Sequence, residues 1–85
     1  MDKEQAFARI ATVIAPYLGA TMAEASIRAH GQKLGIEGGT LSPEQLDALL
    51  AKLRGGLAVF VGREQTTAIV ARIRDSLGKP AEGEA

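Results

Sequence analysis

The histidine at position 30 is the residue of this chain that could take part in the most kinds of reaction. It is the only histidine among 85 residues, and Lys33 follows it three positions later. An imidazole can act as a general acid or base, or as a nucleophile that forms a covalent intermediate. His30 is therefore the first candidate for catalysis or phosphotransfer. The alternative is an ordinary surface or half-buried histidine on a helix.

The spacing of His30 and Lys33 resembles that in the histidine phosphotransfer domains of bacterial relays. Those domains present a helical histidine with a lysine three residues later and a glycine next to the lysine. In this chain Leu34 stands in place of that glycine, and Gln32 stands where an apolar residue is usual. The resemblance covers a handful of residues. It implies, as an alternative function, a phosphotransfer-like signalling domain that uses His30 and Lys33.

The remaining polar residues do not assemble a metal site. The chain has no cysteine, which removes thiolate ligands and disulfides. Glu24 is six positions from His30, which is not the spacing of neighbours on a helix, and Glu37 lies beyond the expected helix end. One histidine with scattered carboxylates is a poor ligand set for zinc or another transition metal. We expect no metal and no cofactor.

The residues that could support other enzyme chemistry have simpler explanations. The serines have no nearby base, and Glu44 and Asp47 lie at a helix start, where acidic residues favour the helix dipole. The loop Gly38-Gly39-Thr40 precedes a helix and could attract an anion, but it lacks the glycine and lysine spacing of a phosphate loop. The sequence therefore predicts a protein that is not an enzyme.

Charge and hydropathy limit the possible partners. Ten basic and ten acidic residues give a net charge of zero, whereas a nucleic-acid binder normally shows a basic excess or stripe. The loop 35–41 is also longer than the turn of a helix-turn-helix reader. Weak nucleic-acid binding remains a second alternative. The first residues form neither a signal peptide nor a membrane span, so we expect a cytoplasmic protein without a membrane partner.

The elements that must position these side chains are predicted to be helices. Apolar residues recur at helical spacing, and the core is rich in alanine and leucine with only three aromatic residues. No internal repeat is evident. The sequence predicts an all-α fold with one helical domain over residues 1–78 and a flexible tail over 79–85. It is expected to be a compact bundle of about four helices, at approximately 2–15, 21–34, 43–61 and 63–77.

The sequence signals for the helix boundaries differ in strength. Pro16 lacks a backbone N–H and disfavours helical dihedrals before it, which predicts a boundary between Ala15 and Ala20. Thr21 and Glu24 have the spacing of a capping box and predict the next helix start. The clearest start is at 41–46, where Ser42 and Gln45 form a capping box and Pro43 takes the first helical position.

The inward faces follow from apolar spacing. In the first helix they are predicted to include Phe7, Ile10, Val13 and Ile14. A thin face of small residues is expected in the second helix, at Met22, Ala25, Ile27, Ala29 and Leu34. The fourth helix should bury Thr66, Ile69, Val70, Ile73 and Leu77.

The third helix is predicted to be the centre of the bundle. Leu46, Leu49, Leu50, Leu53, Leu57 and Phe60 share one apolar stripe. The phase is kept across Gly55-Gly56, so we expect one continuous helix, with a break there as the alternative. Gly56 is then placed near the inward face, where its missing side chain would allow a close helix crossing.

The end of this helix carries the main functional hypothesis. The run Leu57, Ala58, Val59, Phe60 and Val61 is apolar all round, so a helix through it needs cover on more than one side. Ala58 and Val59 are expected on the face away from the core. The sequence thus predicts a regulatory or scaffolding interaction module that forms a homodimer or binds another helical protein. The alternative is that the first and fourth helices cover this run within one chain.

Overall fold

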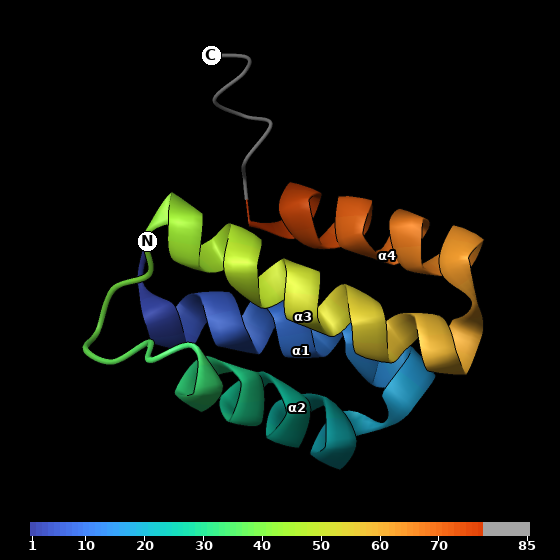
Figure 1. The fold of residues 1–85 in the computed structure, drawn as a ribbon, viewed down its shortest axis with the longest axis horizontal. Coiled ribbons are helices and arrows are strands. Elements are labelled where there is room, and N and C mark those ends of the chain that lie inside the picture. Colours follow the sequence, from blue (N-terminus) through green and yellow to red (C-terminus); the bar gives the residue numbers. More distant parts are fainter. Residues whose placement is uncertain (78–85) are drawn as a thin grey trace.

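The computed structural model of the protein describes residues 1–77, and within them the fold is the predicted all-α bundle (Figure 1). Its helices are α1 (Lys3–Leu18), α2 (Ala20–Lys33), α3 (Pro43–Val61) and α4 (Arg63–Ser76). The predicted tail at 79–85 lies outside the described residues. No helix within residues 1–77 is long and apolar enough to cross a membrane.

The start of α3 forms as its sequence predicts. The Ser42 hydroxyl accepts a hydrogen bond from the Gln45 backbone N–H at 3.1 Å, and the Gln45 side chain accepts one from the Ser42 N–H at 2.9 Å. Pro43 occupies the first helical position. The helix then runs unbroken through Gly55-Gly56 to Val61, which confirms the continuous helix.

Helix α1 does not end where Pro16 predicted. The helix runs on to Leu18, with Pro16 inside its last turn. A proline removes one backbone hydrogen bond, but the turn is held by the Gly19 N–H, which donates to the Ala15 carbonyl at 2.7 Å. Tyr17 and Leu18 also pack against the core. Near a helix end, these contacts offset the single lost bond.

Helix α2 begins one residue earlier than predicted, and by a different device. Gly19 is its N-cap and makes no side-chain hydrogen bond, so the predicted capping role of Thr21 is wrong. Gly19 has φ 91° and ψ 149°, a backbone region essentially restricted to glycine. This single residue both ends α1 and begins α2.

The second turn repeats the first. Gly62 has φ 88° and ψ 166°, ends α3 and begins α4, and its N–H donates to the carbonyl four residues earlier, as that of Gly19 does. Leu34 and Leu77 end α2 and α4 with nearly identical dihedrals. Positions 19 and 62, and positions 34 and 77, are each 43 residues apart. The bundle is therefore two similar helical hairpins, a repeat that the residue identities do not reveal.

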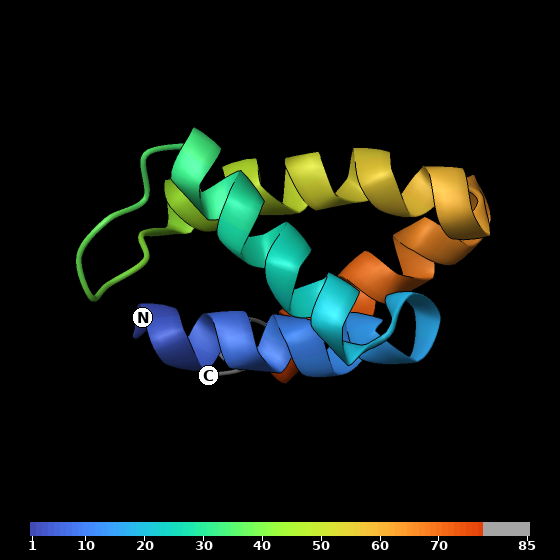
Figure 2. The ribbon, with the colours of Figure 1, turned by 90° about the horizontal axis from the view of Figure 1, so that it is seen from below.

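The two hairpins pack as a pair. Helix α1 contacts α4 and helix α3 contacts α2, while α1 and α3 touch only slightly. Both glycine turns lie at the same end of the bundle (Figures 1 and 2). The hairpins are thus related by an approximate two-fold exchange, in which α1 corresponds to α3 and α2 to α4.

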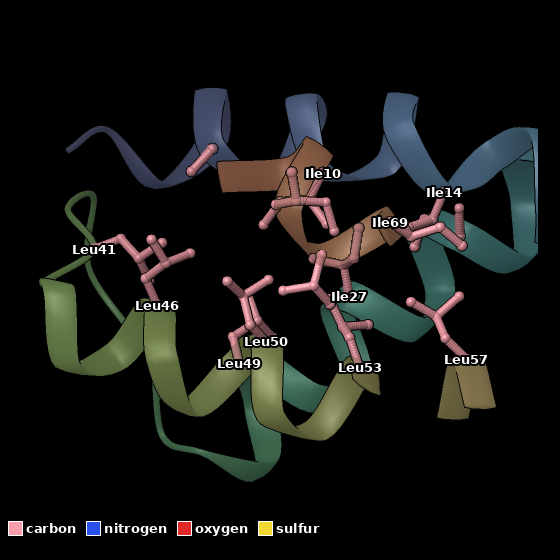
Figure 3. Close-up of a cluster of buried hydrophobic side chains, with 14 of the residues drawn as sticks. Ile10, Ile14, Ile27, Leu41, Leu46, Leu49, Leu50, Leu53, Leu57 and Ile69 are labelled. Atoms are coloured by element: carbon pink, nitrogen blue, oxygen red, sulfur yellow. The ribbon is translucent and has the colours of Figure 1, made fainter. Parts of the chain in front are cut away.

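The helices share one core (Figure 3). The predicted faces of α1 and α4 are confirmed in Ile10, Ile14, Thr66, Ile69, Val70 and Ile73, with Phe7, Val13 and Leu77 partly buried. In α3 the leucines are buried, but Phe60 is exposed. In α2 the buried residues are Ala23, Ile27 and Gly31, so the predicted Met22, Ala25 and Ala29 are wrong.

The error in α2 has a physical reason. Several of its faces carry alanine, so small residues do not mark which face is buried. The buried face is set by packing instead, because a Cβ at Gly31 would lie 3.2 Å from the Phe7 ring. The close helix crossing therefore lies at Gly31 rather than at Gly56, which is exposed and has open space beside it.

Candidate functional site

The exposed large apolar side chains include an adjacent pair in the last turn of α3. Val59 is 83% exposed and Phe60 is 60% exposed. Met22, also exposed, lies in the first turn of α2, at the same end of the bundle. Single exposed apolar residues are common on proteins, but an adjacent pair that includes an aromatic ring forms a larger patch.

The segment predicted to mediate binding divides between core and surface. Leu57 is 2% exposed and belongs to the core (Figure 3), while Ala58 and Val61 are partly buried. Val59 points outward, as predicted. Phe60 was expected inward on the stripe of Leu53 and Leu57, and that expectation is wrong.

Phe60 keeps the helical phase of the core stripe, yet its side chain is exposed, whereas Leu53 and Leu57 are buried. Helix α4 begins at Arg63, directly after the turn that ends α3, so the length of α3 does not explain this exposure.

The hairpin repeat indicates why residues 1–77 leave this ring largely exposed. Tyr17 is the counterpart of Phe60, 43 residues earlier, and its hydroxyl accepts a hydrogen bond from Arg72 of α4 at 3.2 Å. The counterpart of Arg72 in α2 is Ala29. A methyl group cannot reach across as the arginine does, so Tyr17 is partly buried and Phe60 is not.

The segment around Phe60 is uncharged and includes two exposed glycines. Gly55 and Gly56 lie one turn before Val59 and Phe60, are exposed, and have no atom within 4 Å of where a Cβ would stand. No residue from 55 to 62 is charged. We call Gly55, Gly56, Val59 and Phe60 together the α3 end surface. The glycines leave space beside the helix backbone, and the side chains of Val59 and Phe60 project into solvent. This arrangement is suited to contact with another helix.

His30 lies apart from this surface, on α2, and is partly buried. Its Nδ1 is buried and has no hydrogen-bond partner among residues 1–77. Its pKa is lowered by burial, and further by the positive charges of Lys33 and of Lys52 from α3. The sequence suggested Lys33 through its spacing. Lys52 is brought near only by the packing of α3 against α2, and no local signal could have found it.

The lowered pKa of His30 predicts how stability depends on pH. The folded state favours the neutral imidazole, so protonation favours the unfolded chain, whose histidine has a pKa near 6.5. We expect the stabilisation to be complete above about pH 6.5 and to be lost as the pH falls toward the lower folded-state pKa. Urea unfolding between about pH 5 and 8 measures this dependence.

The matched control is His30→Ile, because the counterpart of His30 in the second hairpin is the buried Ile73. This variant should lose the part of the pH dependence that His30 contributes. An identical loss of stability in both proteins below pH 6.5 would assign the effect to other groups.

An open groove of about 640 Å³ is lined by residues of α1 and α2. Its floor includes Phe7 and several alanines, and the Lys3 ammonium lies 5.9 Å from the centre of the Phe7 ring. Charges of both signs border it, so it does not select a ligand charge. Within residues 1–77, no group of three histidine, aspartate or glutamate side chains is placed to hold a metal ion.

Comparisons with protein-family models, with curated proteins and with solved structures find no significant match to this chain.

Proposed function

We propose that this chain is a small non-enzymatic interaction module that binds a helix, from a second copy or from another protein, through the α3 end surface. The observation that supports this most is the exposure of Val59 and Phe60 in adjacent positions of a regular helix. A regulatory or scaffolding role is the function that such a module would serve.

Burial of apolar surface and the preformed helix both favour binding at this surface. Taking a valine or phenylalanine side chain fully out of water contributes about 1.5–3 kcal/mol. Val59 and Phe60 already stand on a formed helix, so little backbone entropy is lost on binding. The nearby glycines let a partner backbone approach closely. Together these features favour helix-to-helix contact.

The test compares the wild-type protein with the double variant Val59→Asp/Phe60→Asp. We expect the wild type to show a mass above 8.9 kDa by light scattering on a sizing column, rising with concentration. The variant should elute as a monomer, because two carboxylates would have to be buried in the contact. Its circular dichroism should be unchanged, since both positions are exposed.

The matched control is Ala68→Asp/Ala71→Asp, which places the same charges on exposed positions of α4. This control should associate like the wild type. A double variant at 59 and 60 that associates as strongly as the wild type would remove the α3 end surface as the site of binding.

A phosphotransfer-like role for His30 is the second candidate, and the position of Lys52 favours it. Two lysines near one imidazole would stabilise a phosphoryl group on the ring, and the lowered pKa keeps the ring neutral and nucleophilic. Incubation with phosphoramidate should then add one phosphoryl group, and His30→Ala should abolish the addition. The same variant should leave association through α3 intact. An unmodified wild-type protein would end this candidate.

A further inference from the structure

We infer that residues 1–3 and residues 39–41 form a clasp that sets how readily the two hairpins separate. The clasp lies at the end of the bundle opposite the glycine turns (Figure 1). It is distant from the α3 end surface and does not depend on the proposed function.

The clasp is a short antiparallel pairing of two backbone segments. The Lys3 N–H donates a hydrogen bond to the Gly39 carbonyl at 2.9 Å. The Leu41 N–H donates one to the Met1 carbonyl at 2.7 Å. Two segments that lie almost 40 residues apart along the chain are thus joined through their main chains.

The position of the clasp is fixed by the start of α1. Asp2 forms the antiparallel bridge with Thr40, and it is also the N-cap of α1. Its carboxylate accepts a hydrogen bond from the Gln5 N–H at 2.9 Å. Because one residue serves both the helix cap and the bridge, the clasp is held in register with α1.

The clasp joins the two hairpins to each other. Residues 1–3 lead into α1 of the first hairpin, and residues 39–41 lead into α3 of the second. Elsewhere α1 and α3 touch only slightly. Each hairpin has its own turn at the far end, so the hairpins can part as intact units. They cannot part fully while the clasp holds the start of α1 to the start of α3.

The clasp is also placed where it can open. Gly38, Gly39 and Thr40 are exposed, whereas Ile36 and Leu41 on either side of them are buried. Exposed backbone hydrogen bonds belong to the parts of a protein that open at the lowest free energy. Opening of the clasp therefore comes before exposure of the core that the two hairpins share.

The first test is Lys3→Pro, which removes one hydrogen bond of the clasp and leaves α1 intact. Lys3 is the first residue of α1, where proline is favoured, and Asp2 before it has ψ 125°, which suits a following proline. The Leu41 amide should exchange with solvent about threefold to tenfold faster. The control is Lys3→Ala, which removes the same side chain but keeps the N–H. Equal exchange rates in the two variants would overturn the clasp.

Separation of the hairpins is measured by labelling a thiol introduced with Ile69→Cys in both backgrounds. Ile69 of α4 is 1% exposed in the shared core (Figure 3), and the chain has no cysteine of its own. Labelling should be faster with Lys3→Pro by about the same factor as the exchange. The urea midpoint should change less, because proline also restricts the unfolded chain. Faster exchange at Leu41 without faster labelling would show a local contact that does not control separation, and would overturn the inference.

Two adjacent glycines of the loop provide changes of opposite sign. Gly38 has φ 85°, whereas Gly39 does not have a positive φ and has open space where a Cβ would stand. Gly39→Ala restricts the open loop and should slow exchange at Leu41 about twofold to fivefold. Gly38→Ala strains the closed loop and should make this exchange faster. Shifts in the same direction would reject a clasp that depends on the conformation of this loop.

Discussion

Replacing Leu49 with alanine is expected to lower the free energy of unfolding by about 2–5 kcal/mol. Leu49 is 0% exposed and lies beside Leu50 and Leu53 in the shared core (Figure 3). Truncation removes apolar contacts and leaves a cavity, because helices held on several sides cannot close over it. The free energy of unfolding of a domain of this size is about 5–15 kcal/mol, so the loss is a large part of its stability.

Chemical denaturation followed by circular dichroism measures this loss. The control is Leu49→Met, which conserves volume and should cost less than about 1.5 kcal/mol. Equal effects of the two substitutions would show that the site tolerates a cavity, and Leu49 would not then be a central core residue.

Replacing Gly62 with alanine is expected to lower the free energy of unfolding by about 1–3 kcal/mol, although no atom lies within 4 Å of the new Cβ. The cost arises in the backbone alone. With φ 88° and ψ 166°, Gly62 occupies a region that residues with a Cβ rarely adopt, and both α3 and α4 depend on it for their ends. Relaxing the strain would turn one helix relative to the other.

Gly55→Ala is the matched control, because Gly55 also has open space beside it but does not have a positive φ. It lies inside α3, where alanine is favoured over glycine by up to about 1 kcal/mol. The two substitutions should therefore shift the unfolding midpoint in opposite directions. Shifts in the same direction would contradict a backbone origin for the effect at Gly62.

The parts of the fold that the sequence predicted well are those with several local signals in agreement. The boundaries of α3 are correct because Ser42, Pro43 and Gln45 mark its start and Gly62 its end. Its five buried leucines are correct because large apolar residues at helical spacing define one face without ambiguity.

The errors arise where local signals are weak or where distant segments decide. A one-residue glycine turn at Gly19 replaced the longer boundary suggested by Pro16 and Thr21. In the candidate site, the outward position of Val59 was predicted from the sequence, but whether Phe60 is covered depends on contacts between the hairpins, such as the one that Arg72 makes with Tyr17. The approach of Lys52 to His30 likewise depends on packing between the hairpins, which residue spacing within one helix cannot predict.

The hairpin architecture also has a consequence for how the chain folds. Its most extensive helix contacts, α1 with α2 and α3 with α4, join segments that follow each other directly in sequence. Such low contact order is typical of bundles that fold in microseconds to milliseconds. Each hairpin needs only a one-residue turn to bring its helices together, so we expect the hairpins to form first and to dock across the loop 35–41 in a later step. Substitutions between the hairpins should therefore mainly accelerate unfolding, whereas those within a hairpin should slow folding.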